Sequence, residues 1–187
     1  MVKTDKWGKS NNCVNVNNSA YQYVLESKTI DTVILVALAQ NMELWGVGNL
    51  PPTSTLEQKF QVLKALLDRD IDDLKSHGKK VILTYDMPTS PIMPNSCIQR
   101  PLKDTACTVT ESQLVDWHPF VDLFENAYGN RSDICIFHQS NVLVMDGKLV
   151  MFDRSGRFLM RDDHHLSLYG SKLMAKKLLR SGCLQTD

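Results

Sequence analysis

The run Thr32-Val-Ile-Leu-Val-Ala-Leu-Ala39 is the most strongly patterned stretch of the chain. It is aliphatic and largely β-branched throughout, without the alternation of a strand that has one face in water. Such a run predicts a strand buried on both faces, as in a parallel sheet. It is also far too short to cross a bilayer, which needs about 20 apolar residues. We therefore take it as a core strand of an α/β domain.

A helix and a second strand follow this run. Apolar residues recur at helical spacing between residues 56 and 74, and Val81–Tyr85 is a second aliphatic run. We expect Thr53 or Ser54 to cap the helix, Ser54 forming a capping box with Glu57. Strand, helix and strand together predict a βαβ unit, which is right-handed in nearly all proteins.

The other predicted elements are less strongly patterned. In chain order they are a hint of a short strand at Cys13–Val16, a short helix at Tyr21–Ser27, a loop at 86–94, a helix at Thr110–Tyr128 kinked or broken at Pro119, a strand at Asp133–Phe137, a hairpin at 142–152 turning at Asp146-Gly147, and a helix at about Ser167–Leu179. The alternation predicts an α/β/α fold with a mainly parallel sheet. Sites in such sheets lie at the carboxyl ends of the strands, so we expect one among loops 39–52, 86–100 and 138–165.

Length and charge limit the function classes. The 187 residues predict a single domain, residues 1–187, with 21 basic and 21 acidic side chains and a net charge of zero. Lysines and arginines are scattered, so we expect no nucleic-acid partner. The first residues contain no apolar segment of the kind found in signal peptides.

The five cysteines leave the redox state open. They fit reduced buried thiols, or one or two disulfides with leftovers in an exported protein. Neither a CxxC pair nor a zinc spacing occurs. Cys135 and His138 could both reach a metal ion, but no partner pair is evident, and we predict no metal and no cofactor.

The segment Arg161-Asp-Asp-His-His-Leu-Ser-Leu-Tyr-Gly170 carries the strongest chemical signal. Asp162 stands three residues before His165, so its carboxylate can accept from the Nδ1–H of the imidazole and leave Nε2 free as a base. Ser167 is a natural N-cap for the following helix. The simpler interpretation is a charged loop with two solvated histidines.

This segment resembles the Asp-x-x-His block of SGNH hydrolases and transferases, in the version found in the C-terminal SGNH domain of acyltransferase-3 membrane proteins such as O-antigen O-acetyltransferases. Two further segments are similar to that subfamily. One is the proline-rich loop from Pro88 that ends in Cys97-Ile-Gln-Arg100, and the other runs from Asp133-Ile-Cys135 through Asp146-Gly147. The resemblance covers roughly residues 10 to 180. It implies a three-layer, flavodoxin-like SGNH fold.

The resemblance also implies roles for individual residues. His165 would be the general base and Asp162 its orienting partner, with Asp163 and His164 as competitors in the next register. In Ala39-Gln-Asn41, at the expected end of a strand, Asn41 would donate to the oxyanion. A surface-turn asparagine is the alternative for that position.

The chain departs from the family at the nucleophile. No Gly-Asp-Ser block occurs in the sequence. We therefore expect a domain that is incomplete at its N-terminus, lacks the family's first strand, and leaves the strand at 33–39 with an open apolar edge. We expect this chain alone to be inactive. The alternatives are a free-standing esterase with an unrecognised serine, and a non-catalytic remnant or interaction module.

For the parent protein the resemblance implies O-acylation, in particular O-acetylation, of a cell-surface glycan such as the O-antigen of lipopolysaccharide. Its partners would be an acyl donor, the glycan acceptor and a membrane acyltransferase-3 domain. Its location would be the periplasmic face of the bacterial inner membrane. None of these expectations comes from composition or periodicity.

Overall fold

The structure is a computed structural model that describes residues 11–37, 50–51, 53–85, 87–98, 107–114 and 117–184. Its centre is a parallel sheet of three strands in the order β1-β2-β4. These are β1 (Thr32–Ala37), β2 (Lys80–Tyr85) and β4 (Cys135–Ile136), and β1 pairs with β2 along its whole length. The predicted α/β fold and the βαβ unit are confirmed.

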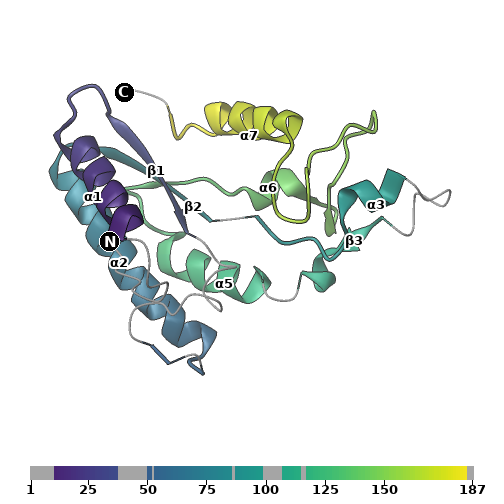
Figure 1. Ribbon diagram of the computed structural model, residues 1–187, viewed down its shortest axis with the longest axis horizontal. Helices are drawn as coiled ribbons and strands as arrows, with labels where there is room; N and C mark the ends of the chain where they lie inside the picture. Colours follow the sequence, from purple (N-terminus) through teal and green to yellow (C-terminus); the bar gives the residue numbers. More distant parts are fainter. Residues whose placement is uncertain are drawn as a thin grey trace.

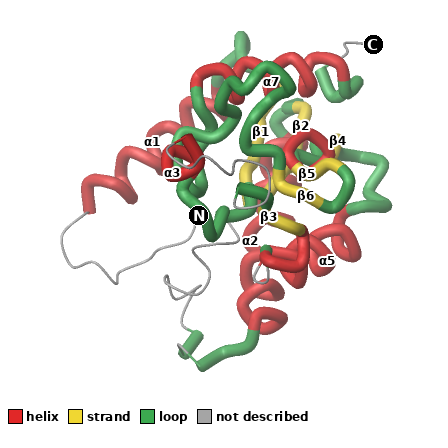
Figure 2. Tube along the Cα trace, turned by 90° about the vertical axis from the view of Figure 1, so that its right-hand side faces the viewer, coloured by secondary structure: helices red, strands yellow, loops and turns green. Residues whose placement is uncertain are grey.

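Helices cover both faces of this sheet (Figures 1 and 2). Helices α2 (Leu56–Ser76) and α5 (Trp117–Tyr128) lie on one side, and α7 (Leu168–Arg180) lies on the other. Aromatic rings hold the layer of α2 and α5 together and join it to the sheet. The Phe60 and Phe120 rings, 5.7 Å apart, connect α2 to α5, and those of Tyr85 and Phe124, 5.1 Å apart, connect β2 to α5. The layered arrangement that the alternation predicted is therefore present.

Strand β1 is an edge strand, since in the described part of the chain it pairs with β2 alone. Ile34 and Val36, which share one face of the strand, are 47% and 49% exposed. The open apolar edge that we expected is thus found. The prediction that this strand is buried on both faces was wrong, because the face of Ile34 and Val36 is about half exposed. Such an edge presents unpaired backbone groups beside apolar side chains and can accept another strand.

A second, smaller sheet contains β3 (Val109–Thr110), β6 (Lys148–Leu149) and β5 (Val144–Met145), all antiparallel. The turn of the predicted hairpin is confirmed. Asp146 and Gly147 both have positive φ, as a two-residue hairpin turn requires. The arms of the hairpin are shorter than predicted, because residues 140–143 form helix α6 (Ser140–Leu143) instead of a strand.

At the N-terminus the hinted strand at Cys13–Val16 was wrong, whereas the short helix predicted at Tyr21–Ser27 is the end of a longer one. Residues that hinted at a short strand belong to one helix, α1 (Asn11–Glu26). Asparagine is a poor helix former, but here tertiary contacts outweigh that propensity. The hydroxyl of Tyr21 donates to the carbonyl of Asp70 and to the carboxylate of Asp73 on α2, and Leu25 is buried in the core.

Two helix starts also differ from the prediction. Helix α2 is capped by Thr55, which forms its capping box with Gln58 rather than through Ser54 and Glu57. Helix α5 begins at Trp117, so Pro119 lies in its first turn, where its missing N–H costs nothing. The residues before it form β3 and a 3-10 turn, Glu111–Gln113.

The proline-rich segment after β2 forms a loop, as predicted, and ends in the short helix α3 (Pro94–Ile98). The predicted strand at 133–137 is reduced to the two residues of β4, although the N–H of Phe137 still donates to the carbonyl of Leu83 at 2.9 Å. Helix α7 agrees with its prediction to within one residue at each end.

Candidate functional site

Residues 161–165 form a tight loop immediately before helix α7. An antiparallel bridge between Met160 and Leu166 closes its base, and the Arg161 N–H donates to the carbonyl of His165 at 2.7 Å. Both bridge residues pack into or against the hydrophobic core. The loop therefore projects polar side chains from a fixed apolar base.

Asp162 and His165 are brought together within this loop. The Nδ1 atom of the His165 ring lies 2.9 Å from each carboxylate oxygen of Asp162. Asp162 Oδ1 also accepts the backbone N–H groups of His164 at 3.1 Å and His165 at 2.7 Å. The carboxylate thus holds the loop and the ring simultaneously, and Nε2 is the ring nitrogen left to exchange a proton with a ligand.

The environment of Asp162 keeps its carboxylate ionised. Desolvation acts to raise the pKa of this group, but hydrogen bonds from the backbone of His164 and His165, the His165 ring and the Arg161 guanidinium outweigh it. The pKa of Asp162 therefore lies well below its usual range. An ionised carboxylate at Nδ1 fixes the imidazole orientation and stabilises the imidazolium once Nε2 has taken a proton.

The competing pair also forms. His164 Nδ1 lies 2.6 Å from Asp163 Oδ1, and the rings of His164 and His165 lie next to each other, with centroids 3.9 Å apart and planes inclined by 45°. Side-chain exposure distinguishes the pairs, because Asp162 is 24% exposed and Asp163 is 38% exposed. Asp162, held by two backbone N–H groups, is the more constrained of the two carboxylates.

The start of helix α7 anchors the loop. The Ser167 hydroxyl accepts the N–H of Gly170 at 2.9 Å, as an N-cap does, and donates to the carbonyl of Phe158 at 2.5 Å. Gly170 is buried directly against the Leu159 carbonyl. The predicted N-cap is confirmed, and Gly170 lets the first turn of α7 pack closely on the base of the loop.

A second brace, which the sequence did not reveal, lies beside it. Arg157 bonds to the Asp153 carboxylate at 2.7 Å and to the Tyr169 hydroxyl at 2.6 Å, with its guanidinium 4.0 Å from the Tyr169 ring centroid. This network ties the turn at 153–157 to the first turn of α7. An arginine twelve residues from a tyrosine carries no recognisable spacing signal.

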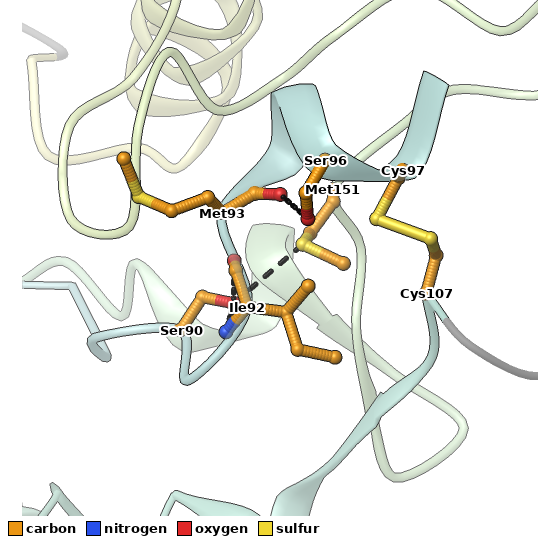
Figure 3. Close-up of a disulfide and its surroundings, with 7 residues drawn as sticks. All are labelled: Ser90, Ile92, Met93, Ser96, Cys97, Cys107 and Met151. Carbon is orange, nitrogen blue, oxygen red and sulfur yellow. Dashed lines mark hydrogen bonds between the residues drawn. A yellow bond between two sulfur atoms is a disulfide. The ribbon is translucent and has the colours of Figure 1, made fainter. Parts of the chain in front are cut away.

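The loop after β2 lies against the Asp–His loop. The Ser90 N–H donates to the carbonyl of Asp163 at 2.7 Å. Its hydroxyl donates to the carbonyl of Ile92 and faces the sulfur of Met151 (Figure 3). The disulfide Cys97–Cys107 holds the far end of this segment. Loops 87–98 and 161–165 thus form one polar edge, as expected for the carboxyl ends of parallel strands.

The cysteine pairing settles a question that the sequence left open. Besides Cys97–Cys107, a second disulfide joins Cys135 in β4 to Cys183 just after α7. Cys135 is therefore not a metal ligand, and the Nδ1 of His138 lies 2.8 Å from Glu125 Oε1 instead. An odd number of cysteines gives no pairing rule, so only the fold could supply this.

The oxyanion donor and the nucleophile are the remaining parts of the expected site. Asn41, the oxyanion candidate, lies outside the described residues. In the described part of the chain, the hydrogen bonds of the His165 ring go to Asp162, and a serine hydroxyl is not among its partners. No helix among the described residues is long and apolar enough to span a bilayer.

Comparison with known proteins agrees with the fold. A family model described as "SGNH domain (fused to AT3 domains)" matches residues 2–180. The structure of the Salmonella ser. Paratyphi A lipopolysaccharide acetyltransferase periplasmic domain is similar with a TM-score of 0.61 at 14% sequence identity. That likeness covers 89% of this chain and 62% of the Salmonella domain, so the chain spans less than two thirds of its length. No curated protein sequence matches.

Proposed function

Because this chain belongs to the family of SGNH domains that are fused to AT3 domains, we propose that its 161–165 loop supplies the acid–base pair of an O-acyl transfer site. The observation that carries the proposal is the bidentate contact of His165 Nδ1 with Asp162 at 2.9 Å. In this role His165 is the general base and Asp162 the group that orients it. The alternative of a charged solvated loop does not explain a carboxylate held by two backbone N–H groups and one ring.

The proposed acyl transfer has two steps, acylation of a serine and transfer of the acyl group to an acceptor. In the first, His165 Nε2 takes the proton of a serine hydroxyl while the serine oxygen bonds to the acyl carbon and the donor leaves. The imidazolium then returns its proton to the leaving group. In the second, Nε2 takes the proton of an acceptor hydroxyl, whose oxygen bonds to the acyl carbon, and the imidazolium returns that proton to the departing serine oxygen. Asp162 remains ionised throughout and balances the charge on the ring.

The nucleophile and the oxyanion donors are not among the residues that the structure brings together. Since the sequence contains no Gly-Asp-Ser block, we expect a companion segment to bring the serine to the carboxyl edge of the sheet. Asn41, which follows the β1 segment in the sequence, remains our candidate for one oxyanion donor. Open edge β1 is where an additional strand of the same sheet would pair.

The substrate class follows from the family and the structural neighbour. We propose O-acetylation of a cell-surface glycan, with the O-antigen of lipopolysaccharide as the first candidate, at the periplasmic face of the inner membrane next to an acyltransferase-3 membrane domain. The support is the family description and the lipopolysaccharide acetyltransferase domain of similar fold. The pair of disulfides is also typical of exported proteins.

The test has two arms that share one set of variants. The purified chain is assayed alone, and again with a separately produced acyltransferase-3 segment that ends in a Gly-Asp-Ser block. Release of p-nitrophenol from p-nitrophenyl acetate and labelling of O-antigen from a radioactive acetyl donor are measured. We expect activity in the second arm only, lowered at least about a hundredfold by His165→Ala. His77→Ala is the matched control, because His77 is also exposed and faces an aspartate, Asp73, at 3.5 Å.

Each outcome decides something. Activity of the chain alone that depends on His165 supports the base but places the nucleophile within the chain, as in a free-standing esterase. Activity in either arm that His165→Ala leaves unchanged contradicts the proposed base. Inactivity of both arms, with the companion segment shown to bind, favours the non-catalytic module.

A further inference from the structure

The adjacent side chains of His164 and His165 add a capability that acyl transfer does not use. The carboxylate of Asp162 and the rings of His164 and His165 each offer one ligand atom, and these atoms all lie within 4.8 Å of one another. The two Nδ1 atoms lie 3.8 Å (His164) and 2.9 Å (His165) from the same atom, Asp162 Oδ1. From this geometry we infer a binding site for a divalent transition-metal ion such as Zn²⁺, held by Asp162, His164 and His165.

The spacing fits zinc chemistry. Zinc binds imidazole nitrogen and carboxylate oxygen at about 2.0–2.2 Å, so neighbouring ligands of a tetrahedral ion are about 3.3 Å apart. The separations of 2.9 Å and 3.8 Å from Asp162 Oδ1 lie on either side of that value, and the three side chains supply three of the four ligand positions from one short loop. Two nitrogen ligands disfavour Mg²⁺ and Ca²⁺, which take oxygen.

The loop is prepared for this role by its backbone. Asp162 Oδ1 accepts the N–H groups of both histidines, which fixes the two residues side by side before any ion arrives. The Ser90 N–H holds the carbonyl of Asp163 at 2.7 Å, so the loop is anchored at its centre as well. The rings are 43% (His164) and 52% (His165) exposed on their side chains, which leaves the ion a path from solvent.

Metal binding and base catalysis exclude each other at this loop. The ion takes the Nδ1 lone pair of His165 and the Asp162 oxygen that otherwise share a proton. The Nδ1 proton passes to solvent and Nε2 takes one up, so that the ring stays neutral and Nε2 no longer acts as a base. Zn²⁺ therefore separates the carboxylate from the ring that it orients. The proposed site would make the Asp–His pair sensitive to free zinc, and His164, which has no part in the proposed acyl transfer, is the residue that makes it so.

Binding is measured without any substrate, so the result is independent of the proposed function. The untagged, oxidised chain carrying Cys13→Ser competes for Zn²⁺ with a chromophoric chelator, and Mg²⁺ is the control ion. We expect one Zn²⁺ per chain, no competition by Mg²⁺, and affinity weakened by more than about tenfold in His164→Ala, since even outer-shell changes at metal sites cost 10–100-fold. His77→Ala, the matched single histidine beside an aspartate, should bind as the parent does.

A second measurement locates the ion. In a nitrogen-15 spectrum of the histidine side chains, Zn²⁺ should shift the ring nitrogens of His164 and His165 and leave those of His77 and His138 in place. Unchanged affinity in His164→Ala overturns the site. So does an equal loss in His77→Ala, or a zinc shift confined to His138.

Discussion

Gly170 packs against the carbonyl of Leu159 so closely that a β carbon at this glycine would lie 2.1 Å from the carbonyl oxygen. The same atom would lie 2.9 Å from the Leu159 carbonyl carbon. The obstacle is backbone, which cannot rotate away as the end of a side chain can. Helix α7 can therefore approach the strand-like segment before the Asp–His loop only because this position has no side chain.

We expect Gly170→Ala to destabilise the protein by about 3 kcal/mol, near the upper end of the cost of overpacking. The physical reason is that α7 must move outward and take the loop base with it. Chemical denaturation followed by circular dichroism measures the change. Gly156→Ala serves as a comparison of a different kind, because its cost comes from a φ of +80° and not from a clash. A Gly170→Ala protein as stable as the parent would contradict the close approach.

Ser167→Ala tests the cap of α7. The hydroxyl accepts the Gly170 N–H and donates to the Phe158 carbonyl, so its removal leaves two partly buried backbone groups unpaired. We expect a loss of about 1–2 kcal/mol in the free energy of unfolding. Ser171→Ala, an exposed serine of the same helix, should change it by less than about 0.5 kcal/mol. Equal effects of the two substitutions would show that the cap is not formed.

The two disulfides should differ in their effect on stability. Cys135–Cys183 spans 48 residues and Cys97–Cys107 spans 10. Loop-closure entropy then gives about 4 kcal/mol for the longer link and about 3 kcal/mol for the shorter. Serine pairs at each position, compared by denaturant midpoint in the oxidised state, should rank in that order. The reverse ranking would mean that the entropy of the unfolded chain is not the main contribution.

Asp133 should make the free energy of unfolding depend on pH in the acidic range. Hydrogen bonds from Arg131 and then Lys75 hold the pKa of its carboxyl well below the usual range. A lowered pKa in the folded state adds stability above the unfolded value of about 3.9, and this is lost as the pH falls further toward the folded value. Because the pair is exposed, we expect at most about 1 kcal/mol.

The measurement is the unfolding free energy of Asp133→Asn and of the parent between pH 7 and pH 2. Their difference should be constant down to about pH 4 and then shrink. Asp146→Asn is the control, because the carboxylate of Asp146 lies in an exposed turn. Asparagine also tolerates the positive φ of this position, so the substitution changes only the charge. A difference that grows as the pH falls would contradict the assigned sign.

Asp162 should be more important for the loop than its charge alone implies. Asp162→Asn keeps an oxygen that can accept the two backbone N–H groups, whereas Asp162→Ala removes it. We therefore expect Asp162→Ala to lower the thermal midpoint more than Asp162→Asn does. Both should release the His165 ring, seen as averaging of its tautomers in nitrogen-15 spectra. Equal midpoints would show that the backbone bonds contribute nothing.

Local pattern was sufficient for the central elements. The aliphatic run of β1 as a strand, the helical spacing of α2 and the position of Ser167 before α7 each depend on local pattern, and these elements are confirmed. Burial of β1 on both faces depends on its neighbours in the sheet, and that part of the prediction was wrong. The Asp162–His165 contact also follows from a short spacing. The SGNH motif is itself an aspartate and a histidine three residues apart, so recognition of the motif already predicts that the two side chains meet.

What the sequence could not give depends on contacts across long separations. Asparagine-rich α1 is a helix because Tyr21 reaches α2, 49 and 52 residues away. The cysteine pairing, and the brace between Arg157 and Tyr169, likewise need the tertiary fold. Val142 and Leu143 favoured a strand by composition, but they belong to helix α6, at whose start the Ser140 hydroxyl lies 2.8 Å from that of Tyr85.

The disulfide between Cys135 and Cys183 closes a covalent ring that contains the Asp–His loop and the whole of α7. A protease that nicks the exposed turn at 154–156 would therefore cut the chain without releasing a fragment. The two pieces would migrate together on a non-reducing gel and separate only after reduction. The segment that carries His165 is thus retained by topology even when its backbone is broken.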